Sequence, residues 1–289
     1  MLKRTAKGTP YLTAPEVCIV AATAWQHEEQ RLGEFLDPLF PDNDYFDDLP
    51  LDDGAKLIKF AGQLCYLSFG QQRSRNAQAA EYLRHVKDQA HGSLFQHVSY
   101  SLLFWGVSRA FTHELVRHGT GTGFSQVSQR YVAGKHLRFV ESLATQFDAI
   151  PDENWTNKEF GKQRLHKSFE CWIDASKEEY ERRESLLLEI AGIDYKTATT
   201  DQRKAVRQEA RRGLPNETEA PILVTGNLRA WRHIVEQRDS VPADSEICRA
   251  IGAAFRALSE HEPLLWEDYT TEQKRADGLP TVSTPFRKV

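Results

Sequence analysis

The chain has 289 residues, of which 40% are hydrophobic and 27% are charged, and its formal net charge is −4 at pH 7. Such a composition is typical of a globular protein with one large or two small domains. The slightly acidic balance excludes a protein-wide basic field for binding nucleic acid, so an anionic ligand would have to be held by a local cluster of arginines.

The first 91 residues predict one strand and two helices. Residues 1–15 are polar and are expected to be loose, whereas residues 16–24 (EVCIVAATA) predict a short buried strand. Residues 27–53 are acidic and rich in turn-forming residues, which indicates a surface insertion. Hydrophobic residues at helical spacing predict helices over about 54–69 and 76–91.

The clearest strand in the sequence is His97–Ser108 (HVSYSLLFWGVS). Both of its faces are apolar, which predicts a strand that is covered on both sides. Ser108 can cap a helix that follows it, and Gly119 is expected to end this helix in the left-handed conformation. The Gly-rich run GTGTGF is then expected to form a loop that leads to SQVSQRYV.

The second half of the chain is mainly helical. Four helices are predicted, over about 160–191, 200–212, 227–239 and 243–260. Residues 270–289 are expected to be an irregular tail. Because helices outnumber strands and do not alternate with them in βαβ units, we expect an α+β fold, with residues 1–289 in one domain.

The cysteines and the hydrophobic pattern indicate the cellular compartment of the protein. The four cysteines are far apart and are typical of buried thiols in a reducing compartment; they are Cys18, Cys65, Cys171 and Cys248. They show no metal-binding spacing, and no metal site is expected. No run approaches 18 apolar residues, and no signal segment opens the chain. We therefore expect a cytoplasmic protein that binds neither membrane nor nucleic acid.

Three arginines, Arg203, Arg207 and Arg211, are spaced four residues apart and would lie on one face of a helix. The spacing has two interpretations. One is a solvated face relieved by Asp201 and Glu209; the other is a phosphate site, because a guanidinium binds phosphate oxygens in a bidentate way.

Two further segments combine polar residues in patterns that fit a ligand. In Thr112–Val132, Glu114 and Arg117 lie on the same helical turn as His118, and the Gly-rich loop that follows leads to the polar segment SQVSQR. A helix-capping loop with one Glu–Arg ion pair would explain the same residues. In TGNLRAWRHIVEQR, Arg238 lies on the packing face of a predicted helix, and a buried arginine needs a partner.

These motifs resemble the flavin-dependent thymidylate synthases. The signature of that family has an arginine–histidine pair followed by SxRY, and Arg117-His118 and Ser128–Tyr131 match it. The likeness continues through RKAVRQEARRGLPNETE and VTGNLRAWRHIVEQR and back through FAGQLCYLSFG, so that it covers most of residues 54–260. The resemblance implies a central antiparallel sheet with flanking helices.

The resemblance also implies residue roles. Arg238 would be the catalytic arginine that stabilises negative charge on the pyrimidine. The uracil nucleotide would be bound by Glu114, Arg117, Gln126, Val127, Ser128, Gln129, Arg130 and Arg211. FAD would be bound by Ser93, Arg117, His118, Asn227, Leu228, Arg229 and His233.

The implied reaction is methylation at C5 of dUMP or UMP, with methylenetetrahydrofolate as the carbon donor and NADPH as the reductant of FAD. The family likeness further implies a homotetramer with sites shared between subunits. Reduced flavin supplies the hydride in this family, so the protein must polarise the uracil electrostatically.

The sequence departs from the family pattern at Gly119, which stands where the signature has a second arginine. GTGTGF also contains one extra residue, and Gln96 replaces a usual glutamate. Either FAD is held differently, by Arg109 or by backbone N–H groups of the loop, or the pocket is shaped for another nucleotide.

Two other functions are compatible with parts of the sequence. Arg117-His118-Gly119 also resembles the RHG signature of histidine phosphatases, in which the histidine carries the phosphoryl group. A non-catalytic nucleotide-binding paralogue would account for the missing arginine, since likeness of fold does not guarantee activity.

Overall fold

The computed structural model describes residues 1–26, 28–41, 51–69, 79–145, 158–272 and 275–287. Its centre is a four-stranded antiparallel sheet in the order β3-β4-β7-β5. The strands are β3 (Glu16–Ala22), β4 (Ser99–Trp105), β5 (Thr122–Gln126) and β7 (Ile222–Asn227). The expected α+β fold with a central antiparallel sheet is confirmed.

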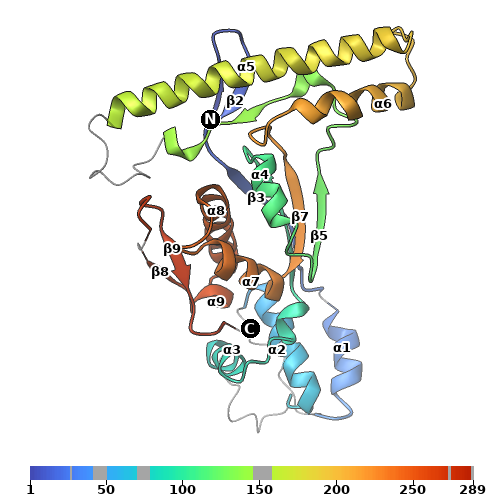
Figure 1. Ribbon diagram of the computed structural model, residues 1–289. Coiled ribbons are helices and arrows are strands. Elements are labelled where there is room, and N and C mark those ends of the chain that lie inside the picture. Colours follow the sequence, from blue (N-terminus) through green and yellow to red (C-terminus); the bar gives the residue numbers. More distant parts are fainter. Residues whose placement is uncertain (27, 42–50, 70–78, 146–157, 273–274, 288–289) are drawn as a thin grey trace.

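Helices cover one face of this sheet (Figure 1). They are α2 (Asp53–Tyr66), α3 (Ala79–Asp88), α4 (Arg109–Leu115), α7 (Leu228–Arg238), α8 (Ser245–His261) and the short α9 (Pro263–Trp266). Alternate residues of β4, among them Leu102 and Phe104, are fully buried against Trp231 and Ile251 in one hydrophobic core. Because side chains alternate between the two faces of a strand, one face of β4 packs against the helices that carry the functional residues.

The opposite face of the sheet is not covered in the single chain, so the expectation that strand 97–108 is covered on both sides is wrong for the described residues. Leu103 and Trp105 are half-buried, and Val20 on β3 is 56% exposed. The same holds for the expected buried strand 16–24. Three of the four cysteines are exposed, and only Cys248 is the buried thiol that we expected.

A second layer of structure packs above the sheet, where α5 (Lys158–Ile190) and α6 (Thr200–Ala210) lie side by side (Figure 1). Against α5 lies a small sheet formed by β1 (Leu2–Arg4), β2 (Pro10–Leu12) and β6 (Phe139–Val140). The expectation that residues 1–15 are loose is therefore wrong, because Tyr11 is buried against Phe139 and Phe169.

The remaining elements are short. Residues 270–289 are not irregular throughout, as expected, because β8 (Thr270–Glu272) pairs with β9 (Thr281–Ser283). In the segment 27–53, α1 (Glu29–Leu36) buries Leu36, while residues 27 and 42–50 lie outside the described residues. The single-turn 3-10 helices are Leu94–Gln96, Gly134–His136, Leu143–Thr145 and Arg211–Gly213. None of the described helices is long and apolar enough to span a bilayer.

Candidate active site

The turn after α4 is built differently from what the sequence suggested. Ser108 caps α4 by accepting a hydrogen bond from the N–H of Phe111, but the helix ends at Leu115, before Arg117 and His118. Gly119 does not adopt a positive φ; Gly121 does, with φ of +73°. A Cβ on Gly121 would lie 2.7 Å from Nδ2 of Asn227, so this position requires glycine.

The expected GTGTGF loop is reduced to residues 119–121, because Thr122 already begins strand β5. Thr122 and Phe124 pair with Gly226 and Val224 of β7, and the Thr122 hydroxyl donates to the carbonyl of His118. Residues 119–121 therefore form a three-residue turn that leads into an edge strand of the sheet.

Arg238, at the end of α7, is held between the turn and α4. Its Nε donates to Nε2 of His118 at 2.8 Å, and its Nη1 donates to the carboxylate of Glu114 at 2.6 Å. Burial lowers the pKa of His118 to about 4, and the nearby charges of Arg238, His233 and Arg117 act in the same direction. His118 is therefore neutral at pH 7 and can accept the hydrogen bond from Arg238.

A pocket of about 660 Å³ lies beside this cluster, and three of the predicted FAD residues line it: Asn227, Arg229 and His233. The other lining residues are Gln96, Thr120, Gly121, Ala230 and Arg287. His233 connects the pocket with the arginine cluster, since its ring centre is 5.8 Å from that of His118.

The side chains of this pocket fit a flavin dinucleotide. Arg229 and Arg287 supply two cations, amide and hydroxyl groups supply neutral hydrogen-bonding partners, and none of the described residues that line the space carries a carboxylate. Gly121 lets the backbone approach closely on one side, where a Cβ would fill the space against Asn227. The volume is also in the range of sites for small molecules and cofactors.

Two predicted FAD residues are placed less directly. The Leu228 side chain is fully buried in the core, and its N–H donates to the carbonyl of Val98, so neither is available to a ligand in this pocket. Ser93 is exposed at the start of the 3-10 helix whose last residue, Gln96, lines the pocket. Asn227 caps α7 by accepting from the N–H of Ala230.

The predicted nucleotide segment lies at the other end of β5. Gln126 donates to the Thr112 hydroxyl at 3.1 Å, and Val127 and Gln129 line a separate pocket of about 430 Å³. The Ser128 hydroxyl accepts from the N–H of Arg130 at 3.4 Å. Within the described chain, Nε2 of Gln129 and Nε of Arg130 are buried without a hydrogen-bond partner, which marks this segment as incomplete on its own.

The three arginines of α6 do not form one phosphate-binding row. Arg203 donates to the carbonyl of Ala198, and the buried Arg207 donates to the carbonyl of Tyr131. Of the three, the Arg211 side chain alone makes no hydrogen bond or ion pair with the residues that the structure describes, and it lies close to Arg109. Burial lowers the pKa of Arg109, and the charge of Arg211 lowers it further, as expected for two cations that lack an anion.

The structure thus brings only part of the predicted site together. Glu114, His118 and Arg238 form one hydrogen-bonded cluster, with Arg117 close enough to affect the pKa of His118. No hydrogen bond or ion pair found in the described residues joins this cluster to Val127–Arg130 or to Arg211. Sequence reasoning missed Arg287, and no motif could have pointed to it.

Comparisons with known proteins agree with this architecture. A family model described as "Thymidylate synthase complementing protein" matches residues 49–264. The chain is 38% identical over 235 residues to a flavin-dependent thymidylate synthase of Mycobacterium sp. (strain KMS), covering 81% of this chain and 86% of that protein. For the flavin-dependent thymidylate synthase of Mycobacterium tuberculosis (strain ATCC 25177 / H37Ra), the identity is 37%, with coverage of 81% and 87%.

A solved structure shows the same fold at low sequence identity. It is a UMP/dUMP methylase, PolB, from Streptomyces cacaoi bound with 5-Br dUMP. The TM-score is 0.59 and the identity is 19%, over 89% of this chain and 95% of that chain.

Proposed function

The chain belongs to the family of flavin-dependent thymidylate synthases, and on this premise we propose that it methylates C5 of dUMP or UMP with FAD as its cofactor. Methylenetetrahydrofolate would donate the carbon, and NADPH would reduce the flavin. The observation that carries the proposal is the cluster in which Glu114 and His118 hold Arg238 beside a flavin-sized cationic pocket.

Arg238 is the proposed catalytic residue. Its side chain is 18% exposed, and two of its three nitrogens are already engaged, by His118 and Glu114. Nη2 has no partner in the described chain and is available to a pyrimidine oxygen or nitrogen. Reduced flavin, when bound, supplies the hydride; the fixed cation would stabilise the negative charge that develops on the pyrimidine.

The phosphate of the nucleotide is assigned to Arg211, together with the residues Ser128, Gln129 and Arg130. Arg211 has no anionic partner among the described residues, and the buried Nε of Arg130 lacks a hydrogen-bond acceptor. Both features fit a site that a charged ligand completes.

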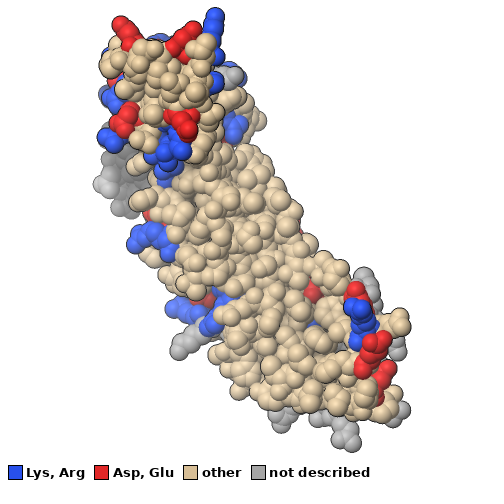
Figure 2. All heavy atoms as spheres, turned by 90° about the vertical axis from the view of Figure 1, so that its right-hand side faces the viewer, with Lys and Arg blue, Asp and Glu red and all other residues tan. Residues whose placement is uncertain are grey.

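We further propose that the enzyme is a homotetramer whose sites are shared between subunits. Figure 2 shows that the broad central surface on this side of the molecule carries almost no charged side chains, whereas charged side chains lie at its two ends and along one edge. The uncovered face of the sheet, with Val20, Leu103 and Trp105, lies in this middle region. Burial of this face between copies would also let one subunit complete the nucleotide site of another. That residues 1–289 form one domain and that the protein is cytoplasmic stay predictions.

Purified protein tests the proposed function directly. We expect it to bind flavin, with absorbance near 450 nm, and to convert dUMP or UMP to the 5-methyl nucleotide when methylenetetrahydrofolate and NADPH are supplied. Bound flavin without turnover of either nucleotide would favour the non-catalytic alternative. Release of phosphate from phosphorylated substrates without flavin would favour the phosphatase, although His118 follows a helix inside the matched family region.

The substrate preference is expected to depend on the turn at residues 119–121. Gly119 has no atom within 4 Å of a Cβ added to it, so the turn leaves space where the family has an arginine. We expect this space to accept the 2′-hydroxyl of UMP. A site that hydrogen-bonds a 2′-hydroxyl discriminates against the deoxy analogue, so UMP should be at least as good a substrate as dUMP. Deletion of Thr120 combined with Gly119→Arg should shift kcat/KM toward dUMP. Turnover of dUMP with no detectable binding of UMP would contradict the prediction.

Replacement of Arg211 by alanine is expected to raise the Kd for the nucleotide by on the order of 10²-fold, because the variant loses a charged hydrogen bond to the phosphate. The nucleoside without phosphate should bind wild type and variant alike. Arg212→Ala is the matched control, since the neighbouring side chain is 72% exposed and bonded to Glu209. If nucleotide and nucleoside lose affinity equally, Arg211 does not bind the phosphate.

A further inference from the structure

The flavin pocket contains one arginine that lies outside the matched family region. Residues 49–264 match the family, whereas Arg287 belongs to the tail that follows. The same pocket is adjacent to Gly119, the position where the family signature has its second arginine. A cation is thus absent from the Gly119 side of the pocket and present on another wall, on a segment outside the matched residues 49–264.

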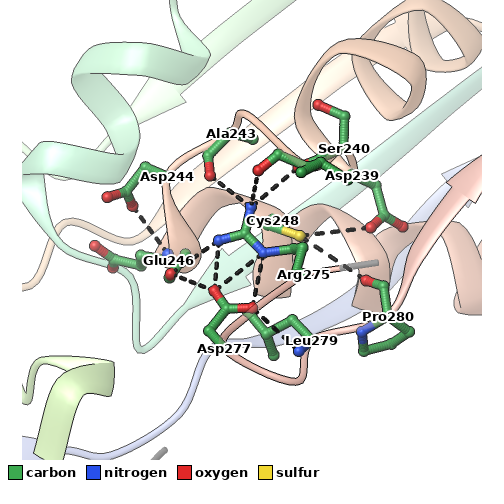
Figure 3. Close-up of polar contacts among 12 residues, drawn as sticks. Asp239, Ser240, Ala243, Asp244, Glu246, Cys248, Arg275, Asp277, Leu279 and Pro280 are labelled. Atoms are coloured by element: carbon green, nitrogen blue, oxygen red, sulfur yellow. Dashed lines mark hydrogen bonds and ion pairs between the residues drawn. The ribbon is translucent and has the colours of Figure 1, made fainter. Parts of the chain in front are cut away.

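The start of the tail is fixed to the helices by Arg275, as Figure 3 shows. Its Nη1 donates to the carbonyls of Ser240 and Ala243, at 3.0 and 2.6 Å, in the connection between α7 and α8. Asp277 accepts three further hydrogen bonds from the same guanidinium, and it also accepts from the Ser245 hydroxyl at 2.6 Å. Arg275 and Asp277 lie between β8 and β9, so this anchor attaches the tail to the α7–α8 connection between its two strands.

The end of the tail is fixed as well. Val282 is buried, and its N–H donates to the carbonyl of Asp239. The Thr284 hydroxyl donates to the buried Asp268, the Phe286 N–H donates to Thr284 at 3.1 Å, and the Phe286 ring packs against the main core. Arg287 is therefore placed at the pocket by the folded residues that precede it, although its own side chain is exposed.

The charge around Arg287 favours an anionic ligand. Among the described residues that line the pocket, Arg229 and Arg287 carry a charge. Among the described residues, the Glu236 carboxyl group interacts with Arg287; burial raises the pKa of Glu236 to about 7, against the charges of Arg232 and Arg287, so it neutralises Arg287 only in part. A second pocket, of about 350 Å³, repels anions because its lining carries five carboxyl groups: Glu141, Glu217, Asp244, Glu246 and Asp277.

We propose that Arg287 of the C-terminal tail binds the diphosphate of FAD and so replaces the arginine that Gly119 has removed from the signature. The diphosphate is the anionic part of oxidised FAD, and a guanidinium binds phosphate oxygens in a bidentate way. The inference rests on the proposed flavin site, and it explains how a chain without the second signature arginine binds the same cofactor.

The test is a fluorescence titration of the full-length chain with FAD. Arg287→Gln, which keeps a polar side chain but no charge, should raise the Kd for FAD by about 10- to 100-fold, the effect of one charged hydrogen bond. Arg287→Lys should retain part of the affinity. Adding Gly119→Arg to Arg287→Gln should restore most of it, because the open space around Gly119 accepts a side chain.

A control variant and the other possible outcomes decide whether the effect is specific to the charge of Arg287. Arg182→Gln, which removes an arginine that is 61% exposed on α5, should not change the Kd. If wild type binds FAD and Arg287→Gln binds it equally well, the inference is wrong while the proposed function stands. A lack of rescue by both Arg287→Lys and Gly119→Arg would also overturn it, because the loss would then not concern charge. If wild type binds no flavin, the proposed function fails together with the inference.

Discussion

Arg238→Ala is expected to reduce methylation by roughly 10²- to 10³-fold in kcat while FAD still binds. The estimate is the cost of removing one preorganised donor from a site of developing negative charge, about 3–4 kcal/mol of barrier. Arg238 fits this role because Glu114 and His118 fix its guanidinium before substrate arrives. A group that is already oriented does not need to reorganise during the reaction.

The same cluster predicts how other variants of Arg238 behave. Arg238→Lys keeps the charge but cannot bond Glu114 and His118 through two nitrogens of one planar group, so it should recover only a small part of the rate. The low pKa of His118, about 4, keeps its imidazole neutral and accepting throughout the neutral range. The hydrogen bond from Arg238 should therefore not limit activity between pH 6 and 8.

Single-turnover assays with pre-reduced flavin would measure the effect on the chemical step, and flavin absorbance and Tm would show that the variant is folded. Arg182→Ala, on the exposed surface of α5, is the control for loss of an arginine in itself. Activity of Arg238→Ala within a few-fold of wild type would show that Arg238 is not the catalytic arginine.

The sequence predicted the central strands and helices because their periodicity is local. Strand β4 and helices α7 and α8 carry enough apolar residues at regular spacing to be recognised. Strands β2 and β5 could not be recognised in this way. β2 has three residues, β5 consists largely of glycine and polar residues, and each is held by pairing with strands far away in the sequence.

For the site, the motifs predicted residue types better than distances. They named Glu114, His118 and Arg238 as site residues with three different roles, and the structure shows these three bonded together. They could not show that Arg203 and Arg207 have partners within the chain, since each partner depends on tertiary packing. Arg287 was not predictable, because its position depends on an anchor built around Arg275.

The C-terminal tail also depends on a buried ionic network, and Asp268→Asn is expected to lower the free energy of unfolding by about 3–5 kcal/mol. Asp268 accepts from Lys87 at 2.7 Å and from Arg232 at 2.7 and 3.1 Å, and these two side chains are almost fully buried. An asparagine of the same shape would remove the carboxylate that is hydrogen-bonded to both cations and leave Lys87 with the more distant Glu267, at 3.8 Å. It would also weaken the contact with Thr284, which holds the tail.

The pH dependence distinguishes this network from ordinary packing. Burial alone would raise the pKa of Asp268, but hydrogen bonds and charge from Arg232, and then from Lys87, hold it well below its usual value. A carboxyl group with a depressed pKa stabilises the fold above the unfolded pKa of about 3.9 and loses this effect as the pH falls further. Denaturant unfolding should therefore show a constant difference between wild type and Asp268→Asn from pH 5 to 8.

Below about pH 4 this difference should shrink, because the Asp268 carboxylate of wild type is then protonated in the unfolded state and the asparagine cannot titrate. Glu179→Gln is the matched control, since Glu179 also accepts from two cations, Arg182 and Arg183, but on the exposed surface of α5. Solvent screens that pair, so its loss should barely change Tm even though the pKa of Glu179 is lowered to about 2. If Asp268→Asn unfolds like wild type, or if the difference between them is the same at pH 3 and pH 7, the charge of Asp268 does not stabilise the fold.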